Sequence, residues 1–420
     1  MDFITLPTGD FTLKNVTLPA ALLGQDGDLI TTDMALSGGR IAEAPIGPEV
    51  DMARAIVLPA FVDMHTHLDK GHIWPRAANP DGTFMGALNA VGADRSARWT
   101  AEDVRARMEF GLRAAYAHGT RAIRTHLDSI PPQHSISFPV FEELRESWAG
   151  RIELQAVNLV PCDMVAEPIF LEIAKTVAHA QGVLGAVTYP TPGLDDDLRL
   201  FFEIATLHGR DADFHVDETL DPASETLRAI ALAVDETGFE GRVTVGHCCS
   251  LSSQDPGRAE DTLGLVAATG IHVVSLPMCN LYLQDRGPGT PRLRGITLVH
   301  EMRDNAIPVS FASDNTRDPF YAYGDLDMLE VMRQATRIGH LDHSRSDWPL
   351  AFSAAPAAAM GISPQTLAPG ASADLVIFNA RDWTELYARP QSDRVVLRGG
   401  AAIDRTLPAY AELDHLMEVS

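Results

Sequence analysis

Two histidines separated by a single residue, His65 and His67, end an apolar run that begins at Ala55. Residues two apart in a β-strand point to the same side, so this run would deliver both imidazoles from the end of a buried strand. Two neutral imidazoles placed in this way can bind one metal ion. Two polar residues on a solvated strand face explain the spacing equally well, because a short motif gains meaning only from its context.

That context comes from four further apolar runs, which also end in chemically active side chains. Three imidazoles and a carboxylate suit a borderline divalent ion and leave positions open for water. We therefore predict the metal ligands His65, His67, His215 and Asp314. The active side chains that end the four runs are His126 with Asp128, His215 with Asp217 and Glu218, His247, and Asp314.

Two of these residues could move protons around a bound ion, which lowers the pKa of its water toward about 7. Glu218 follows His215 by three residues and suits a general base that then acts as an acid. His247 could orient the hydroxide or stabilise negative charge, and His126 and Asp128 could orient the ligands. Taken singly, each residue has an equal structural explanation, as a hydrogen-bonded core histidine or a helix cap.

The residues between these sites alternate between strand-like and helix-like patterns, for example a predicted helix over 101–118. Eight strand and helix units over such a length predict an α/β fold of the TIM-barrel type, in which reactive groups lie at the carboxyl ends of the strands. Short strands with turn glycines flank this region on both sides, and joining them into one small sheet would bury their apolar faces. The predicted barrel strands are 55–64, 122–125, 152–159, 183–187, 213–216, 243–246, 271–276 and 308–312.

Composition narrows the class of protein. A formal charge of -24 over 420 residues argues against nucleic acid or anionic lipid as a partner. Four cysteines without a C-x-x-C pair do not make a disulfide framework and favour a reducing compartment. With neither a signal-peptide pattern nor an apolar run of about 18 residues, we expect a cytoplasmic enzyme that binds a small molecule, forms a homo-oligomer and does not bind membranes.

Together the strand ends resemble the amidohydrolase superfamily, and within it the bacterial cytosine deaminase group, which also includes an N-alkylaminotriazine hydrolase. The resemblance extends from Leu58 to Gly399. It rests on His65-Thr66-His67, Arg124-Thr125-His126-Leu127-Asp128, Ile152-Glu153-Leu154-Gln155, His215 with Glu218, His247, Leu283-Gln284-Asp285-Arg286, Arg294-Gly295-Ile296-Thr297, Phe311-Ala312-Ser313-Asp314-Asn315 and Ala373-Asp374-Leu375-Val376-Ile377-Phe378.

This resemblance implies a distorted (β/α)8 barrel, residues 58–365, and a small β-sandwich domain built from both chain ends, residues 1–57 and 366–420. It implies one Zn2+ or Fe2+ and attack of metal-bound hydroxide on an amidine carbon of a heterocycle, with loss of ammonia. Glu218 would shuttle the proton, His247 would help to activate the hydroxide, and Asp314 would bind the metal or accept a proton. Branches with two metals need a lysine after strand four, where this chain has Thr188-Tyr189-Pro190.

Departures from the cytosine deaminases concern the substrate. Cys162, or Pro161 in an ungapped match, stands where those enzymes carry a pyrimidine-binding glutamine, Asn315 replaces a second aspartate, and Phe320 replaces a tryptophan. Trp74 could stack on a flat ring and Arg76 could meet its carbonyl or carboxylate, although such a loop is equally common at subunit contacts.

The sequence therefore predicts a deaminase for a cytosine-like aminopyrimidine or a related cyclic amidine. The first alternative is hydrolysis of a substituted amino group from an aminotriazine-like ring. The second is a non-catalytic, ligand-binding member of the fold, which is disfavoured because no predicted ligand is missing and Glu218 is present.

Overall fold

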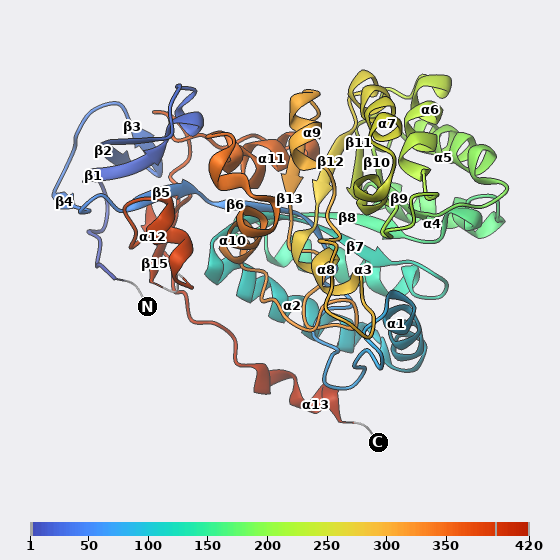
Figure 1. Cartoon of the computed structure of the whole chain (residues 1–420). Coiled ribbons are helices and arrows are strands. Elements are labelled where there is room, and N and C mark those ends of the chain that lie inside the picture. The colour runs from blue at the N-terminus through green and yellow to red at the C-terminus, as the bar shows by residue number, and fades with distance from the viewer. Residues whose placement is uncertain (1–2, 391–392, 419–420) are drawn as a thin grey trace.

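The computed structural model describes residues 3–390 and 393–418 (Figure 1). Its larger part contains two parallel sheets, one of three strands and one of five. The first consists of β6 (Phe61–Thr66), β7 (Thr120–Asp128) and β8 (Glu153–Leu159). The second consists of β9 (Leu184–Thr188), β10 (Ala212–Val216), β11 (Val243–His247), β12 (His272–Ser275) and β13 (Val309–Phe311).

Isolated bridges, not continuous ladders, join the two sheets. Val157 pairs with Val183 between β8 and β9, and Thr66 pairs with Asp314 where the first strand meets the last. At that second seam the buried Asp63 carboxylate accepts hydrogen bonds from the Ser313 amide at 3.0 Å and the Ser313 hydroxyl at 2.5 Å. The two sheets do not form one continuous, closed sheet. The prediction of an α/β fold is therefore confirmed in the form of a barrel-like arrangement, without a closed hydrogen-bonded barrel.

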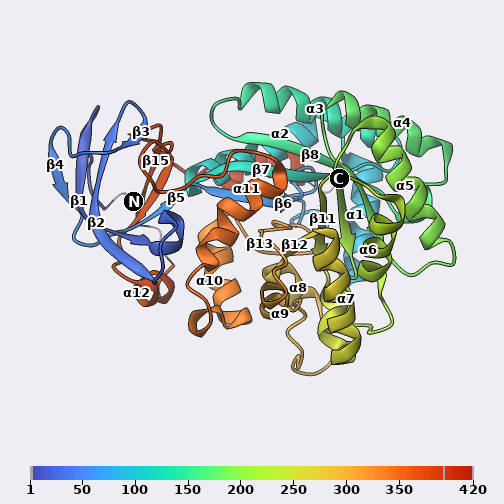
Figure 2. The ribbon, with the colours of Figure 1, turned by 90° about the horizontal axis from the view of Figure 1, so that it is seen from above.

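Helices flank these strands, as Figures 1 and 2 show. The predicted helix over 101–118 is confirmed: Thr100 caps its first turn, and Gly119 ends it with a φ of 104°. Its apolar stripe, which includes Met108 and Leu112, is buried. The helices of this part are α1 (Phe84–Arg98), α2 (Ala101–His118), α3 (His134–Ser147), α4 (Pro168–His179), α5 (Leu194–His208), α6 (Thr226–Thr237), α7 (Pro256–Thr269), α8 (Pro277–Leu283), α9 (Val299–Asp304), α10 (Met328–Gly339) and α11 (Ala354–Met360).

Strands from both ends of the chain form a second, smaller body, seen beside the barrel in Figure 2. They make one sheet in the order β16-β15-β14-β5-β1-β2-β3, with β4 paired to β1. Its division into the two layers of a sandwich and the domain boundaries stay predictions. The strands are β1 (Phe11–Pro19), β2 (Leu29–Ser37), β3 (Arg40–Ala42), β4 (Glu49–Asp51), β5 (Ile56–Pro59), β14 (Leu375–Phe378), β15 (Arg394–Arg398) and β16 (Ala401–Ala402). Helix α12 (Trp383–Ala388) lies between β14 and β15 in the chain, and α13 (Asp414–Met417) lies near the barrel helices (Figure 1).

The single strand predicted over 55–64 is wrong. The chain forms two strands there, because the Ala60 amide donates to the Asp374 carbonyl at 2.8 Å and hydrogen bonding changes sheets at this residue. β5 pairs with β14 in the small sheet, whereas β6 pairs with β7 in the barrel. The apolar run is continuous because both strands are buried, so hydrophobicity alone does not mark the break.

Within the described ranges, no helix is at once long and apolar enough to cross a bilayer. The cytoplasmic location and the homo-oligomeric assembly stay predictions.

Candidate active site

The carboxyl ends of four barrel strands bring the predicted reactive side chains together. His65 and His67 come from the end of β6, His215 from β10, His247 from β11, and Asp314 from the turn after β13. His247 and Asp314 adopt the left-handed backbone region, with φ values of 70° and 63°. Such values are strained for residues other than glycine and gather at functional sites.

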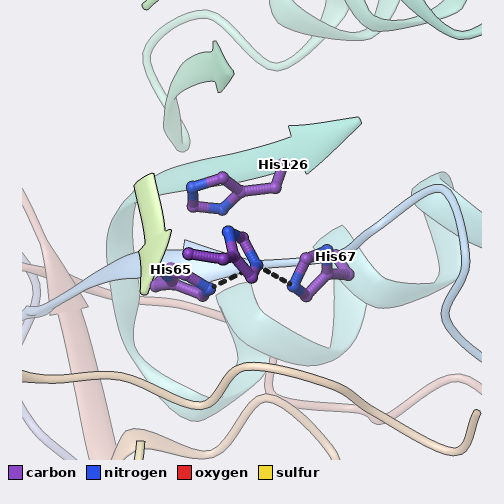
Figure 3. A group of neighbouring side chains, drawn as sticks. His65, His67 and His126 are labelled. Atoms are coloured by element: carbon purple, nitrogen blue, oxygen red, sulfur yellow. Dashed lines mark hydrogen bonds between the residues drawn. The ribbon is translucent and has the colours of Figure 1, made fainter. Parts of the chain in front are cut away.

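Three imidazole nitrogens and one carboxylate oxygen lie within contact distance of one another. The His215 Nε2 atom is 3.1 Å from His65 Nε2 and 3.2 Å from His67 Nε2. The Asp314 Oδ1 atom is 3.2 Å from His67 Nε2 and 3.7 Å from His65 Nε2. Figure 3 shows the His65 and His67 rings turned toward a common point, with His126 beside them.

These atoms fit a bound divalent ion. Donors about 2.0–2.1 Å from a tetrahedral ion lie about 3.3 Å apart, close to the spacing seen here. Within the described residues, both Asp314 carboxylate oxygens are buried without a hydrogen-bond partner. Buried polar atoms are normally paired, so the cluster has the orphaned acceptors that an ion would satisfy.

Burial keeps the imidazoles neutral, as ligation requires. The pKa values of His65, His67 and His215 are held well below the usual range, first by burial and then by neighbouring imidazoles and the Lys70 ammonium. Burial also raises the pKa of Asp314 to about 7, and the positive charge of an ion would oppose this rise.

Glu218 lies at the rim of this cluster, with a side chain that is 12% exposed. Its Oε1 atom is 3.6 Å from His247 Nδ1, and this oxygen has no hydrogen-bond partner among the described residues. Burial, and next the Asp314 carboxylate, raise the pKa of Glu218 well above its usual value. The preceding Asp217 anchors the loop by accepting from the Thr226 and Leu227 amides, both at 3.0 Å.

The predicted role of His247 depends on which ring nitrogen carries the proton. The Asn280 side-chain amide donates to His247 Nδ1 at 2.9 Å, which leaves the proton on Nε2. Burial lowers the pKa of His247 to about 3, so the ring is neutral. In the part of the chain that the structure describes, Nε2 has no partner, so it is free to donate a hydrogen bond.

His126 lies behind the ligands, where the sequence suggested an orienting residue. Its ring centroid is 4.0 Å from that of His65, and its Nε2 atom is 3.2 Å from Asp213 Oδ1. Asp213 also accepts from Arg124 Nη1 at 2.6 Å, and both side chains are buried. Asp128 instead pairs with Arg95 at 2.8 Å and with Lys70 at 3.5 Å.

Lys70 is a site residue that sequence reasoning missed. Its ammonium lies 5.0 Å from the Phe320 ring centroid and interacts electrostatically with the Asp318 and Asp314 carboxylates. Burial opposes the charge, but Asp128 and Asp318 outweigh it, so the pKa of Lys70 is raised. Its position three residues after His67 was the available signal.

The predicted substrate residues Asn315 and Phe320 border the cluster. Asn315 Nδ2 donates to Asp318 Oδ2 at 2.7 Å, and its Oδ1 accepts from the Cys279 thiol at 3.5 Å. The Phe320 ring packs edge-on against the Phe84 ring, with 5.4 Å between the two ring centroids. Cys279 and Asp318 therefore hold the amide that the sequence proposed as a substrate contact, and neither was predicted.

The other substrate predictions have different outcomes. Cys162 is buried after β8, near the Tyr189 amide, while Trp74 is half-buried and its amide bonds the Arg317 carbonyl at 2.8 Å. Their contact with substrate stays a prediction. The suggestion that Arg76 meets substrate is wrong, because its guanidinium binds two internal carboxylates, Asp94 at 2.9 Å and Asp103 at 2.5 Å.

Comparison with known proteins agrees with this geometry. The amidohydrolase family matches residues 165–403. The chain is 54% identical over 420 residues to a pterin deaminase from Rhizobium rhizogenes (strain K84 / ATCC BAA-868), covering 96% of each chain. It is 24% identical over 373 residues to N-isopropylammelide isopropyl amidohydrolase from Pseudomonas sp. (strain ADP), covering 83% of this chain and 87% of that one.

Solved structures show the same fold. 5-Methylcytosine deaminase from Klebsiella pneumoniae, liganded with 5-fluorocytosine, superposes with a TM-score of 0.81 at 24% identity and covers 93% of this chain and 97% of that chain. The family match spans more than half of the sequence, and a relative at 54% identity covers nearly all of it. The chain therefore belongs to the amidohydrolase family.

Proposed function

We propose that this protein is a metal-dependent aminohydrolase that removes the amino group of a pterin as ammonia. The observation that carries the substrate is the 54% identity, over 96% of the chain, to a pterin deaminase. The amino-bearing carbon of a pterin lies between two ring nitrogens, so it is a cyclic guanidine, which contains the amidine unit. The proposal thus narrows the wider prediction of a cyclic amidine and replaces cytosine with a larger, two-ring substrate.

The metal would be held by His65, His67, His215 and Asp314, whose donor atoms meet at one point. A divalent ion at this point would supply a water of lowered pKa as the nucleophile. The metal identity, Zn2+ or Fe2+, stays part of the proposal. No lysine follows β9, where Tyr189 and Pro190 stand, which supports a single ion.

Glu218 is the proposed proton carrier. It would take one proton from the attacking water and give it to a ring nitrogen. It would then take the second proton, from the hydroxyl on the attacked carbon, and give it to the amino group, so that the carbon–nitrogen bond breaks, ammonia leaves and a carbonyl forms. Its Oε1 atom lies 3.6 Å from His247 Nδ1, and it has a carboxylate oxygen within 4.8 Å of one of Asp314, which supports this role. A pKa raised well above the usual value suits a group that both accepts and donates protons near neutral pH.

Two neighbours would bind the substrate ring and the developing charge. His247 Nε2 would donate to the oxygen that becomes the carbonyl, because its Nδ1 is occupied by Asn280. The Lys70 ammonium, 5.0 Å from the Phe320 ring, would meet a ring acceptor or carbonyl of a substrate lying against Phe320. Phe320 in place of a tryptophan leaves room for a second ring.

Ammonia release from zinc- or iron-loaded protein tests the proposal, using pterin, cytosine, 5-methylcytosine and N-isopropylammelide. We expect ammonia from pterin at a far higher kcat/KM than from cytosine. Isopropylamine release from N-isopropylammelide would favour the triazine alternative, and cytosine as the best substrate would return the assignment to a cytosine-like ring. A metal-replete protein inactive on the whole panel would support a non-catalytic role.

Glu218→Gln is the matched variant for this assay, because it keeps the shape of the side chain and removes its proton-carrying ability. We expect kcat to fall by about 10²–10⁴-fold, the usual contribution of general acid–base catalysis. Metal content and melting temperature should stay near those of the parent protein. A near-normal kcat would contradict the proton-carrying role.

A further inference from the structure

A cavity of about 620 Å³ lies at the opposite end of the barrel strands from the proposed metal ligands. Arg121 and Glu153, at the starts of β7 and β8, form part of its wall. Along β7 the distance from Arg121 to His126 is about 17 Å, at about 3.3 Å for each residue. None of the residues that line this cavity belongs to the metal-ligand cluster.

The lining of this cavity is rich in guanidinium groups, although the protein carries a formal charge of -24. Four arginines face two carboxylates, those of Glu153 and Asp374, and the side chains of Gln155 and Gln181 complete the polar wall. The arginines are Arg121, Arg145, Arg151 and Arg398.

Two of the guanidinium groups have hydrogen-bonding capacity left over. The Nε atoms of Arg121 and Arg398 are buried and make no hydrogen bond within the described residues. Each group is anchored at its other end, since Arg121 Nη2 donates to the Ser363 carbonyl at 2.9 Å and Arg398 Nη1 to that of Thr120 at 3.3 Å. Asp374 Oδ1 lies 3.5 Å from Arg398 Nε, too far for a good hydrogen bond.

Cation–π packing also holds two arginines in place. The Arg151 guanidinium lies 3.8 Å from the Trp148 ring centroid, and that of Arg398 lies 5.5 Å from Tyr116. A guanidinium with a fixed orientation loses little entropy when it binds an oxyanion, which is why arginine is common at phosphate sites. The cavity therefore has preorganised donors and an excess of positive charge.

We propose that this cavity binds the phosphate group of a small metabolite of nucleotide size. Phosphate oxygens would accept from Arg121 and Arg398, and Arg151 would add charge at the mouth. Glu153 and the two glutamines could meet hydroxyl or amine donors elsewhere on the same ligand. A free inorganic phosphate and a nucleoside monophosphate would make the same contacts with the arginines. Only the nucleoside monophosphate could also bind Glu153 and the two glutamines.

The proposed anion site shares no side chain with the metal-ligand cluster, but a chain of hydrogen bonds connects the two. Gln155 Oε1, at the cavity wall, accepts from Arg124 Nε at 2.7 Å. Arg124 in turn bonds Asp213, which pairs with His126 beside the metal ligands. We expect anion binding to persist when the catalytic site is saturated, because no side chain is shared between the two.

Isothermal titration calorimetry of the full-length, metal-loaded protein at low salt tests the proposal, with inorganic phosphate and AMP as the probes. Arg121→Gln removes one buried donor group, and Arg151→Gln removes an exposed one with less risk to folding. We expect each substitution to weaken binding about tenfold, the effect of losing one charge-assisted contact. Arg381→Gln, at a guanidinium whose side chain is 61% exposed and paired with Glu385, is the matched control and should bind as the parent does.

The outcomes separate clearly. Tighter binding of AMP than of phosphate, lost in Arg121→Gln and Arg151→Gln, identifies a nucleotide site, and equal binding of both probes identifies an inorganic phosphate site; either supports the proposal. It is overturned if neither probe binds, or if both variants bind like the control while their melting temperatures show them folded. Competition by saturating pterin, without any effect of the two variants, would place the probe in the catalytic site and also overturn it.

Discussion

Asp213→Asn should destabilise the protein strongly, because it leaves a buried guanidinium without a countercharge. The side chains of Arg124 and Asp213 are 1% and 0% exposed, and Arg124 Nη1 lies 2.6 Å from Asp213 Oδ2. An asparagine still offers an oxygen to the guanidinium, so the substitution removes mainly the charge. Breaking a buried pair in this way costs about 3–5 kcal/mol of unfolding free energy.

The remaining contacts of Arg124 limit how much unfolding free energy Asp213→Asn loses. Nη1 also donates to Thr244 Oγ1 at 3.2 Å, while Nε donates to Gln155 Oε1 at 2.7 Å and Nη2 to the Ala359 carbonyl at 3.3 Å. These neutral acceptors satisfy hydrogen bonds but do not neutralise the charge. We therefore expect a loss near the lower end, about 3 kcal/mol.

Urea unfolding of the metal-loaded protein, followed by tryptophan fluorescence, measures this loss. Asp211→Asn is the matched control, because Asp211 is only two residues from Asp213 in the chain. Asp211 pairs with the half-exposed Arg242, and surface ion pairs contribute about 0–1 kcal/mol. The double variant Arg124→Gln/Asp213→Asn should be more stable than the sum of its single changes predicts. The reasoning is refuted if Asp213→Asn unfolds within about 0.5 kcal/mol of the parent protein.

Three further substitutions test the site and its support. His65→Ala should lower bound metal, measured by plasma emission spectroscopy, far below the one ion per chain that we propose; unchanged content would remove His65 from the ligand set. Lys70→Met removes a cation beside Asp128, so carboxylate pKa values should rise and the acidic limb of the pH–rate profile should move to higher pH; an unmoved limb would contradict this. Asp327→Asn should lower the melting temperature at neutral pH, since Arg394 outweighs burial and holds the pKa of Asp327 far below its usual value. That stabilisation exists above the unfolded pKa of about 3.9 and is lost as pH falls through the folded value, so the difference in melting temperature should close in acid, and a pH-independent difference would contradict the assignment.

The strand-end rule explains how much of the site the sequence could predict. His65, His215 and Asp314 are far apart in the chain, yet parallel strands in a barrel-like arrangement bring their carboxyl ends to one edge. Periodicity and residue type were therefore enough to predict that these side chains meet. The metal itself and the role of each residue stay predictions that the variants above address.

Residues outside strands escaped prediction for a physical reason. Asn280 lies on α8 and Asp318 in the loop after β13, and no periodic pattern fixes where such segments place a side chain. Arg76 failed for a related reason, because its partners Asp94 and Asp103 lie on or near separate helices that fold back over it. The break at Ala60 was invisible because both flanking strands are buried and the apolar run continues through it.

The seam between β6 and β13 gives the proposed metal a mechanical role. Among the residues that the structure describes, these strands pair through one isolated bridge, Thr66 with Asp314, and through the Asp63–Ser313 hydrogen bonds, which join residues 250 apart in the chain. His65 and Asp314 lie on opposite sides of the seam, so an ion bound by both would link the first barrel strand to the last. Its removal by a chelator should then release the edges of β6 and β13, and amide hydrogen exchange should quicken there first.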